Sequence, residues 1–385
     1  GNRIHQHFDL DFAIHGGIDQ RIQYFPTAEG VDHDFDGAAV LGSGGGGDPY
    51  IGKLMAKQAI REHGPVRLAP VEEVPDDELI IPSAMMGAPA VMLEKLPNGS
   101  EPELAFRALE KHLDRTAYGV ISIEAGGLNS CIPIYTAARL GLPLVDADGM
   151  GRAFPELQMV TFSVAGVPST PMVICDEKGN RMILETITNQ WSEVLARTAT
   201  VAMGLSSMLS IYCVDGRTLK RSAVRGTLSL AAEIGKRILR SNRSEEDPVA
   251  AILRVTRGFR LFVGKITDVS RDLTSGFVRG RVLIEGTDED KGSGCEIEFQ
   301  NENLLARRDG QPAAVTPDLI TVLDRESAFP ITTEGLKYGQ RVAVIGMPCD
   351  RFWRSEQGLA HVGPRYFQYD IDYTPVEELA GRREP

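Results

Sequence analysis

The sequence changes its hydrophobic pattern once, and this change limits the folds that the chain can adopt. From residue 36 to about residue 241, short apolar runs alternate with longer helical runs, which predicts an α/β domain. Beyond Gly258 the runs are short and β-type, and Gly, Asp and Pro separate them, which predicts strands. We therefore expect an α/β N-terminal domain followed by a smaller, mostly β C-terminal domain, arranged as a barrel or a sandwich.

The polar stretch 240–248 is the natural place for the boundary between the two domains. The predicted organisation is an N-terminal extension (1–35), an α/β domain with glycine-rich loops (36–245) and a β-rich domain (246–385). Helices are expected at 49–63, 102–115, 130–140, 189–203, 227–239 and 249–256. Strands are expected at 66–74, 79–83, 120–123, 143–146, 158–164, 172–175, 182–186 and 208–214, and in the second domain at 260–269, 276–285, 295–301, 319–323 and 341–346.

The segment 144–156 carries the strongest indication of a functional site. A short apolar strand runs into Asp146, Asp148, two glycines and Arg152. Side chains two residues apart on a strand point to the same face, and ligands of open α/β sheets bind at the carboxyl ends of strands. The alternative is ordinary turn chemistry, in which an Asp caps the following helix.

Two other glycine-rich loops indicate that the three loops share one pocket. The first contains Gly45, Gly46 and Gly47 before Asp48, and its backbone N–H groups are suited to an anion or a polarised carbonyl. It lacks the Gly-Lys-Ser/Thr of a P-loop, so no nucleotide is expected.

In the second loop, the predicted strand 120–123 delivers Glu124 to its end, and Asn129 follows within the turn into a helix. Asn129 is expected either to bind substrate or to cap that helix. Cys131, at the start of the helix, is a competing candidate for a nucleophile, against the more usual role of a small buried side chain.

Charge and cysteine content restrict the partners. The net charge is -12 and the pI is about 5.2, which argues against nucleic acid and anionic membranes. The longest apolar stretch, 203–214, is broken by Gly and Ser and is too short to span a membrane. Five widely spaced cysteines without a C-x-x-C pair are typical of reduced thiols, so we expect a cytoplasmic protein. Large apolar segments in both domains lead us to expect a homo-oligomer as well.

Near the C-terminus, the segments 347–354 and 361–373 gather Cys349, His361, arginines and aromatic residues. Such a surface could close over a pocket in the first domain. The alternative is aromatic packing on a sheet. The first residues lack the basic start and apolar core of a signal peptide.

Several of these motifs together resemble the S-methyl thiohydantoin desulfurase family, also described as hydantoinase-like, over residues 37–375. The motifs are Gly44-Gly-Gly-Gly-Asp-Pro-Tyr50, Glu124-Ala-Gly-Gly-Leu-Asn129, Asp146-Ala-Asp-Gly-Met-Gly-Arg-Ala-Phe-Pro-Glu156, Gly226-Thr-Leu-Ser-Leu-Ala231 and Gly363-Pro-Arg365. The resemblance implies a two-domain hydrolase that replaces a sulfur substituent on a five-membered imidazolidinone-type ring with water, and a divalent metal is in keeping with such chemistry. Where the family commonly has Gly-Pro-Arg-Ala-Phe-Gly-Tyr-Asp, this chain has Gly363-Pro-Arg-Tyr-Phe-Gln-Tyr-Asp370.

Hydrolysis needs an activated water, charge stabilisation and a proton for the leaving group. The sequence assigns these roles to residues in the glycine-flanked loops, and it leaves the metal and its ligands as a hypothesis, since His is scarce. The catalytic candidates are Glu124, Asp146 and Asp148; the substrate-binding candidates are Gly45, Gly46, Gly47, Asn129, Arg152 and Arg365; the metal-ligand candidates are Asp48, Asp148 and His361. The alternative function is a non-catalytic ligand-binding or regulatory subunit of a hydantoinase/oxoprolinase-type system.

Overall fold

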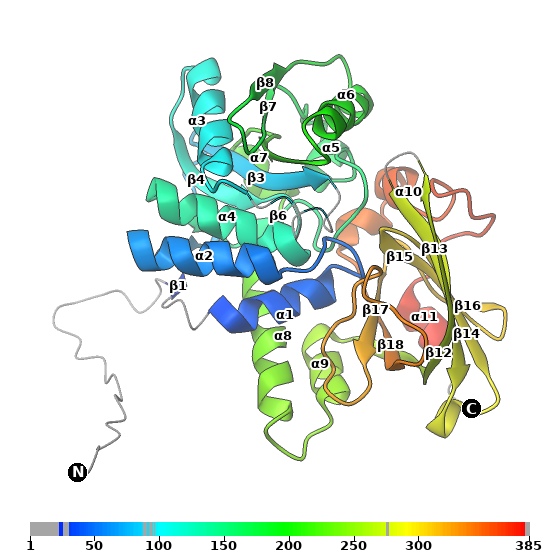
Figure 1. The fold of residues 1–385 in the computed structure, drawn as a ribbon. Coiled ribbons are helices and arrows are strands. Elements are labelled where there is room, and N and C mark those ends of the chain that lie inside the picture. The colour runs from blue at the N-terminus through cyan, green and yellow to red at the C-terminus, as the bar shows by residue number, and fades with distance from the viewer. Residues whose placement is uncertain are drawn as a thin grey trace, which may run out of the picture.

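The computed structural model describes residues 23–25, 31–87, 91, 95, 97–274 and 277–381. Figure 1 shows an α/β part that carries most of the helices and a β-rich part beside it. The helices of the α/β part are α1 (Val31–Leu41), α2 (Tyr50–His63), α3 (Glu101–Leu113), α4 (Gly127–Leu140), α5 (Thr161–Val164), α6 (Asn189–Ala202), α7 (Gly216–Ser222), α8 (Thr227–Ser241) and α9 (Pro248–Thr256).

A mixed sheet forms the centre of the α/β part, in the order β1-β2-β5-β4-β3-β9-β7-β8, with β10 also paired to β3. Its strands are β1 (Gln23–Phe25), β2 (Val66–Ala69), β3 (Leu79–Gly87), β4 (Ala117–Ser122), β5 (Leu144–Val145), β7 (Met172–Cys175), β8 (Arg181–Leu184), β9 (Ser206–Ser210) and β10 (Val214–Asp215). The adjacent strands β3 and β4 are parallel, with Ser83 opposite Ser122. Their carboxyl ends therefore reach the same edge of the sheet.

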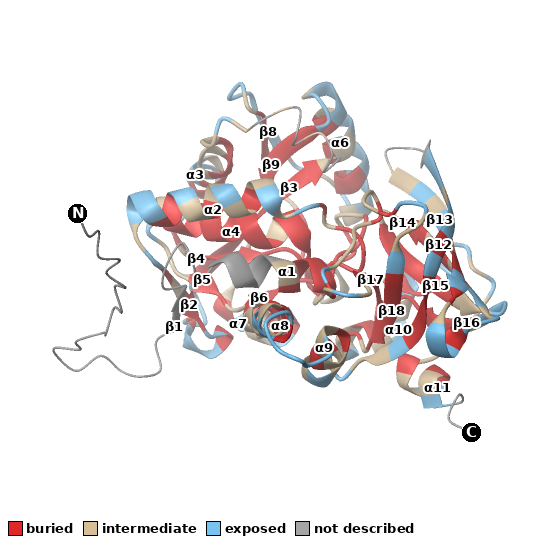
Figure 2. Cartoon of the chain, turned by 60° about the horizontal axis from the view of Figure 1, so that its bottom comes forward, coloured by how far each residue is buried: buried red, intermediate tan, exposed pale blue. Residues whose placement is uncertain are grey.

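Both faces of this sheet are buried, as Figure 2 shows by the red strands at its centre. In β4, Val120 packs into the hydrophobic cluster that contains side chains of α2, α3 and α4, whereas Ile121 packs into a second cluster that includes residues of α1, α6 and α8. In β3, Ile81 packs into the same cluster as Val120, and Ile80 packs into the same cluster as Ile121. This double burial explains why the strands read as continuous apolar runs.

The β-rich part is one antiparallel sheet in the order β16-β15-β14-β13-β12-β18-β17. Contacts between β15 and β17, which are not neighbours in the sheet, show that it curls into a half-barrel. The sequence analysis predicted a mostly β domain, which the structure confirms. The sheet forms an open half-barrel instead of a closed barrel. Its strands are β12 (Phe259–Thr274), β13 (Phe277–Gly286), β14 (Gly294–Gln300), β15 (Glu302–Arg308), β16 (Gln311–Val315), β17 (Leu319–Asp324) and β18 (Arg341–Met347), followed by the 3-10 turn Arg351–Arg354 and the helices α10 (Glu356–Val362) and α11 (Val376–Gly381).

The strand predicted at 158–164 is wrong, because this segment contains the short helix α5. A short apolar run does not distinguish a strand from a buried helical turn by its period. The backbone N–H of Thr161 donates to the carbonyl of Gly149 at 2.7 Å, and Phe162 is buried against Tyr212. The expected strand that ended at residue 301 stops at Gln300, and β15 and β16 were not predicted.

The glycine-rich loop after α1 joins the two parts of the molecule. The Oγ of Ser43 donates to the carbonyl of Ile320 in β17 at 2.9 Å. The N–H of Asn303 donates to the carbonyl of Ser43, and the N–H of Thr333 donates to the carbonyl of Gly44, each at 2.8 Å. The loop therefore lies directly on the β-rich sheet.

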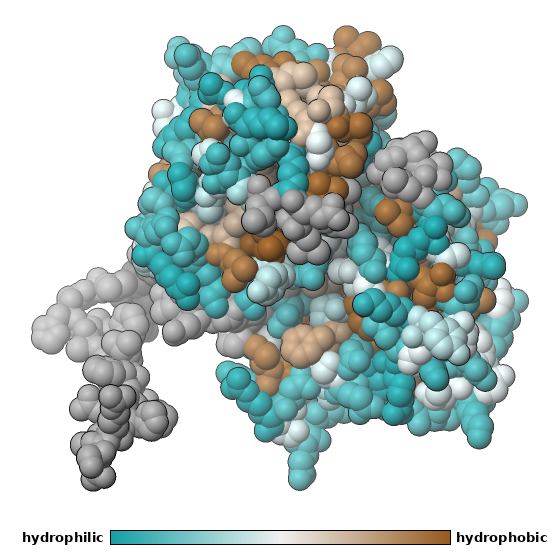
Figure 3. Space-filling view, viewed as in Figure 1, coloured by the Kyte–Doolittle hydropathy of each residue, from teal (hydrophilic) through white to brown (hydrophobic). Residues whose placement is uncertain are grey.

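Apolar side chains gather on the surface of α6, at the upper right of Figure 3. Trp191, Val194 and Val201 are each about half exposed there. Within the described part of the chain, no helix is both long enough and apolar enough to span a bilayer.

Candidate active site at the contact between the two parts

A pocket opens where the glycine-rich loop, the edge of the central sheet and the β-rich part meet. The α/β part supplies Gly45 and Gly46, the end of β3, Glu124, Asn129 and residues of the 150–157 loop. The β-rich part supplies Asn301, Glu302 and Glu334. The pocket therefore needs both parts of the chain.

Glu124 follows β4 and is 6 % exposed. Burial raises the pKa of its carboxyl to about 7, although hydrogen bonds from the Asn129 side chain and the Phe154 backbone and the charge of Arg152 act in the opposite direction. A carboxyl that titrates near neutral pH can both accept and return a proton under ordinary conditions. Glu124 is thus suited to acid–base chemistry.

Asn129 connects Glu124 to the end of β3. Its Nδ2 donates to Oε1 of Glu124 at 2.6 Å and to the carbonyl of Met85 at 3.1 Å, while its Oδ1 accepts from the N–H of Met85 at 2.6 Å. It lies in the first turn of α4, but the side-chain cap that the sequence analysis gave as an alternative is not formed at the N-terminus of that helix. Instead, its amide fixes the position of a carboxyl in the pocket.

Glu302 is a second buried carboxyl in the pocket, and the sequence analysis did not single it out. It begins β15 and is 3 % exposed, and its Oε2 is buried without a hydrogen-bond partner. Burial and the nearby charge of Glu124 raise its pKa well above the ordinary value, against the opposing effect of Arg152. Both effects favour the neutral form of this side chain next to Glu124.

Glu334 is a further acidic residue of the lining. Burial raises its pKa, and its Oε2 also lacks a partner. The one arginine in the described lining, Arg197, already pairs with Glu193 and donates to the carbonyl of Pro155. The described lining is consequently rich in carboxyl groups and contains no arginine that is free to pair with them.

The glycine-rich loop contributes close backbone approach to this pocket. A Cβ at Gly45 would lie 2.0 Å from Oε1 of Glu302, and a Cβ at Gly46 would lie 2.8 Å from the backbone of Gly126. Gly46 also accepts from the N–H of Leu128 at the start of α4, at 2.9 Å. Gly45 and Gly46 line the pocket, whereas Gly47 packs behind it with its carbonyl near Gly127.

Asp146 and Asp148 do not line the pocket. Asp146 accepts from the N–H groups of Leu228 and Ser229 and from the Ser229 hydroxyl, so it binds the N-terminus of α8. Asp148 belongs to the short strand β6 (Ala147–Asp148), which pairs with β11 (Val224–Arg225), and it is fully buried.

The carboxyl of Asp148 holds loops together. Both oxygens accept from the N–H of Gly151, at 2.9 and 2.8 Å, and the backbone N–H groups of Met150 and Ala125 also bind it. Burial nevertheless raises its pKa well above the ordinary value. Because Ala125 follows Glu124, this contact fixes the loop that carries Glu124.

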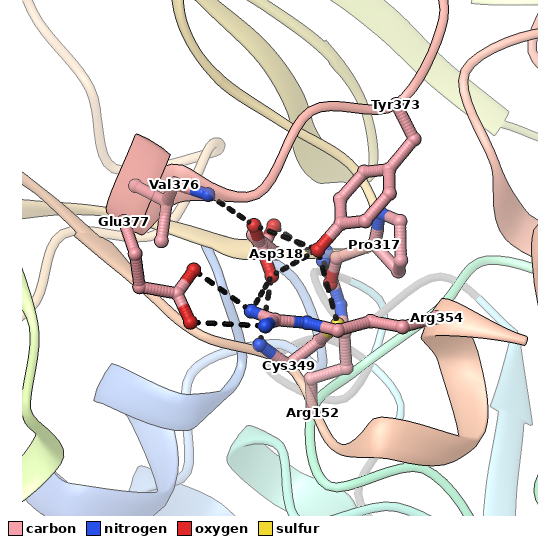
Figure 4. A network of polar contacts seen from close by, with 8 residues as sticks. All are labelled: Arg152, Pro317, Asp318, Cys349, Arg354, Tyr373, Val376 and Glu377. Carbon is pink, nitrogen blue, oxygen red and sulfur yellow. Dashed lines mark hydrogen bonds and ion pairs between the residues drawn. The ribbon is translucent and has the colours of Figure 1, made fainter. Parts of the chain in front are cut away.

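Arg152 is fully buried and points toward the β-rich part, as Figure 4 shows. Its Nη1 donates to the carbonyls of Pro317 and Asp318, at 2.7 and 2.9 Å, and its guanidinium lies 4.3 Å from the centre of the Phe154 ring. Burial lowers its pKa to about 10, which leaves it charged at neutral pH. In this position Arg152 joins the two parts and supports the pocket wall through Phe154.

The carboxylate of Asp318 is the centre of the network in Figure 4. It accepts from Arg354 at 3.1 Å, from the Tyr373 hydroxyl at 3.1 Å and from the N–H groups of Cys349 and Val376 at 2.9 and 2.7 Å. These partners come from the C-terminal segments for which the sequence analysis gave two alternatives, closure over a pocket and aromatic packing on a sheet. Their main contacts are structural, and burial raises the pKa of the Cys349 thiol strongly.

The remaining candidates lie apart from the pocket lining. Asp48 is exposed and accepts from the N–H of Tyr50 at the start of α2. His361 lies on α10 with its Nδ1 2.8 Å from the carbonyl of Gln357, and Arg365 is exposed and pairs with Asp370 and Asp372. Cys131 is buried in the core of the α/β part.

The proposed metal-ligand set is not assembled. Asp148 is surrounded by backbone N–H groups, while Asp48 and His361 make separate local contacts. Among the described residues, no group of three or more His, Cys, Asp and Glu side chains is arranged to hold a metal ion. These donors do not fit a metal ion as they stand.

The fold and pocket define a two-part protein in which an α/β layer and an antiparallel half-barrel enclose a carboxyl-lined site. Two family models cover nearly the whole chain: the S-Me-THD-like N-terminal domain matches residues 31–186 and the S-Me-THD-like C-terminal domain matches residues 187–376. The chain belongs to the S-Me-THD-like family, which confirms the resemblance seen in the sequence. The family boundary crosses the central sheet, because β9 of the second segment pairs with β3 of the first.

The chain is also similar to a solved structure. A crystal structure of a protein from Chromobacterium violaceum shares 26% sequence identity with it and superposes with a TM-score of 0.78, covering 91% of this chain and 99% of that one. No curated protein matches the chain significantly.

Proposed function

We propose that the protein is a hydrolase that removes the sulfur substituent of an S-methyl thiohydantoin-like five-membered ring. The observation that carries this proposal is Glu124, a buried carboxyl with a pKa of about 7 in a pocket formed by both parts of the chain. Membership in the S-Me-THD-like family supports the class of substrate.

Glu124 acts as base and then as acid in the proposed reaction. Its carboxylate takes a proton from water as the water oxygen bonds to the ring carbon that carries sulfur. The C–S bond then breaks, its electron pair goes to sulfur, and Glu124 returns the proton to give methanethiol. The second proton of the water ends on the ring nitrogen, whose C=N bond has become a C–N bond. The ring carbon becomes a carbonyl.

The other residues of the site position this carboxyl. Asn129 holds Oε1 of Glu124, Asp148 holds the following backbone N–H, and Arg152 supports Phe154, whose N–H also binds Glu124. Acid–base groups of this kind contribute about 10²–10⁴-fold to rate.

The test is thiol release from an S-methyl thiohydantoin by the purified full-length protein and two variants. Glu124→Gln keeps the size of the side chain but cannot take a proton, so release should fall by at least about 100-fold. Glu233→Gln is the matched control, because Glu233 pairs with Arg237 on α8, outside the pocket. Equal release by wild type and Glu124→Gln would contradict the assignment, and ligand binding without release by the wild type would favour the non-catalytic binding subunit.

Three further properties remain predictions. A divalent metal is tested by elemental analysis of the protein together with thiol release in the presence and absence of a chelator. A homo-oligomer is tested by light scattering, and a cytoplasmic location by cell fractionation.

A further inference from the structure

The pocket contains a carboxyl that the proposed reaction has not yet used. Glu302 is 3 % exposed, lines the pocket and has a buried Oε2 without a partner. A buried carboxyl that is ionised and unpaired is costly, whereas its neutral form has one O–H to donate. Oε2 has no partner among the described residues, so a bound molecule can supply the acceptor for an O–H at this atom.

The position of Glu302 is fixed from the opposite side. Oε1 of Glu302 packs closely against Gly45. A Cβ at position 45 would lie only 2.0 Å from this oxygen, so the close packing requires glycine. The charged groups that act on Glu302 are Glu124 and Glu334, which disfavour a second negative charge, and Arg152, which favours it. Burial acts more strongly than any of these charges and raises the pKa of Glu302 well above its ordinary value.

We propose that Glu302 donates its carboxyl proton to a ring nitrogen, and that the site thereby selects rings with a basic C=N nitrogen, namely cyclic amidines and isothioureas. This inference rests on the proposed function and identifies the second proton path. When water adds to the ring carbon, the C=N electrons go to the nitrogen that has received the Glu302 proton. When the C–S bond breaks, the hydroxyl proton of the added water returns to Glu302 and the Glu124 proton goes to sulfur.

The same arrangement makes a prediction about binding that does not depend on turnover. A ring that is already protonated on its nitrogen cannot accept the Glu302 proton. Glu302 therefore has to release its proton when such a ring binds. A neutral ring of the same size causes no such release. Two suitable probes are 2-aminoimidazoline, a cyclic guanidinium, and imidazolidin-2-one, the corresponding cyclic urea.

The experiment is titration calorimetry of the full-length protein at pH 8 in buffers with different heats of protonation. The wild type should bind 2-aminoimidazoline at least tenfold more tightly than imidazolidin-2-one and should release about one proton only with the former. Glu302→Gln should lose the proton release. Glu296→Gln, on the outer face of β14 beside Arg281, should behave as the wild type.

Each outcome separates this inference from the proposed function. Equal binding of the two probes by the wild type, or proton release that persists in Glu302→Gln, would overturn the role of Glu302 even if thiol is released. Selective binding with proton release, but without thiol release from the S-methyl substrate, would support the substrate class and contradict the desulfurase reaction. The comparison of probes on the wild type needs no variant, so it holds even if Glu302→Gln does not fold.

Discussion

The amide of Asn129 donates a hydrogen bond to the carboxyl of Glu124, with 2.6 Å between Nδ2 and Oε1. The same amide is fixed at both ends by the backbone of Met85, at the end of β3. The acid–base group of the proposed reaction is thus tied to the edge of the central sheet, and its pKa depends on this contact.

Replacing Asn129 by Ala should raise the pKa of Glu124, because the hydrogen bond from Asn129 favours the ionised carboxyl. The acid limb of kcat/KM against pH should move upward by about one to two pH units, since a hydrogen bond to a charged group is worth roughly 1.5–3 kcal/mol. Asn189→Ala is the matched control, because Asn189 bridges the backbones of Ser169 and Val167 in the first turn of α6, outside the pocket. An unchanged pH profile in Asn129→Ala would refute the link.

The stability of the protein should depend on pH through Glu124. The pKa of this carboxyl is raised in the folded protein to about 7 from 4.5, so the unfolded chain loses this proton first as pH rises. The stabilising contribution is present below about pH 4.5, falls as the pH rises to 7 and is lost above it, an effect of about 3 kcal/mol. Urea unfolding between pH 5 and 8 should therefore show a smaller decline in Glu124→Gln than in the wild type, and parallel curves would be the contrary result.

Gly45→Ala should damage the pocket by displacing Glu302. The added Cβ meets Oε1 of Glu302 at 2.0 Å, so the carboxyl or the loop has to move. We expect a loss of about 1–3 kcal/mol in the free energy of unfolding and a fall of at least about tenfold in kcat/KM. At Gly294 a Cβ meets nothing within 4 Å, and Gly294→Ala serves as the control. Similar kinetics in the two variants would show that this close approach is unimportant.

The sequence located Glu124 correctly at the end of a buried strand, because an apolar run followed by a carboxylate and two glycines is a local signal. It could not separate Glu124 from Asp146 and Asp148, which follow a similar run. What distinguishes them is their partners: Asp146 meets the N-terminus of α8, more than 80 residues further along the chain, and Asp148 meets backbone N–H groups. Such partners follow from tertiary structure alone.

Glu302 had no comparable signal. It lies where β14 turns into β15, in a polar stretch that resembles an ordinary hairpin turn. Its burial comes from contact with Gly45, more than 250 residues earlier in the chain. The half-barrel was predictable from its short β-type runs, but the pocket that it completes depends on how the two parts of the chain pack.

Trp353 should stabilise the pocket wall from the β-rich part. Its Nε1 donates to the carbonyl of Met150 at 2.7 Å, and its ring meets Phe154 edge-on, with 5.1 Å between the ring centres. Trp353→Phe leaves this buried carbonyl without its donor, so the free energy of unfolding should fall by about 1–3 kcal/mol. KM should rise as well, because Met150 and Phe154 both line the pocket.

The second tryptophan of the chain provides the control and the probe for this test. Trp191 is 51% exposed on α6, so Trp191→Phe should change stability by less than about 0.5 kcal/mol. In that variant Trp353 is the remaining tryptophan, and its fluorescence reports on the contact between the two parts during urea unfolding. If Trp353 becomes solvent-exposed at lower urea than the loss of far-UV circular dichroism, the two parts separate before they unfold. Coincident transitions would show that the pocket and the core unfold together.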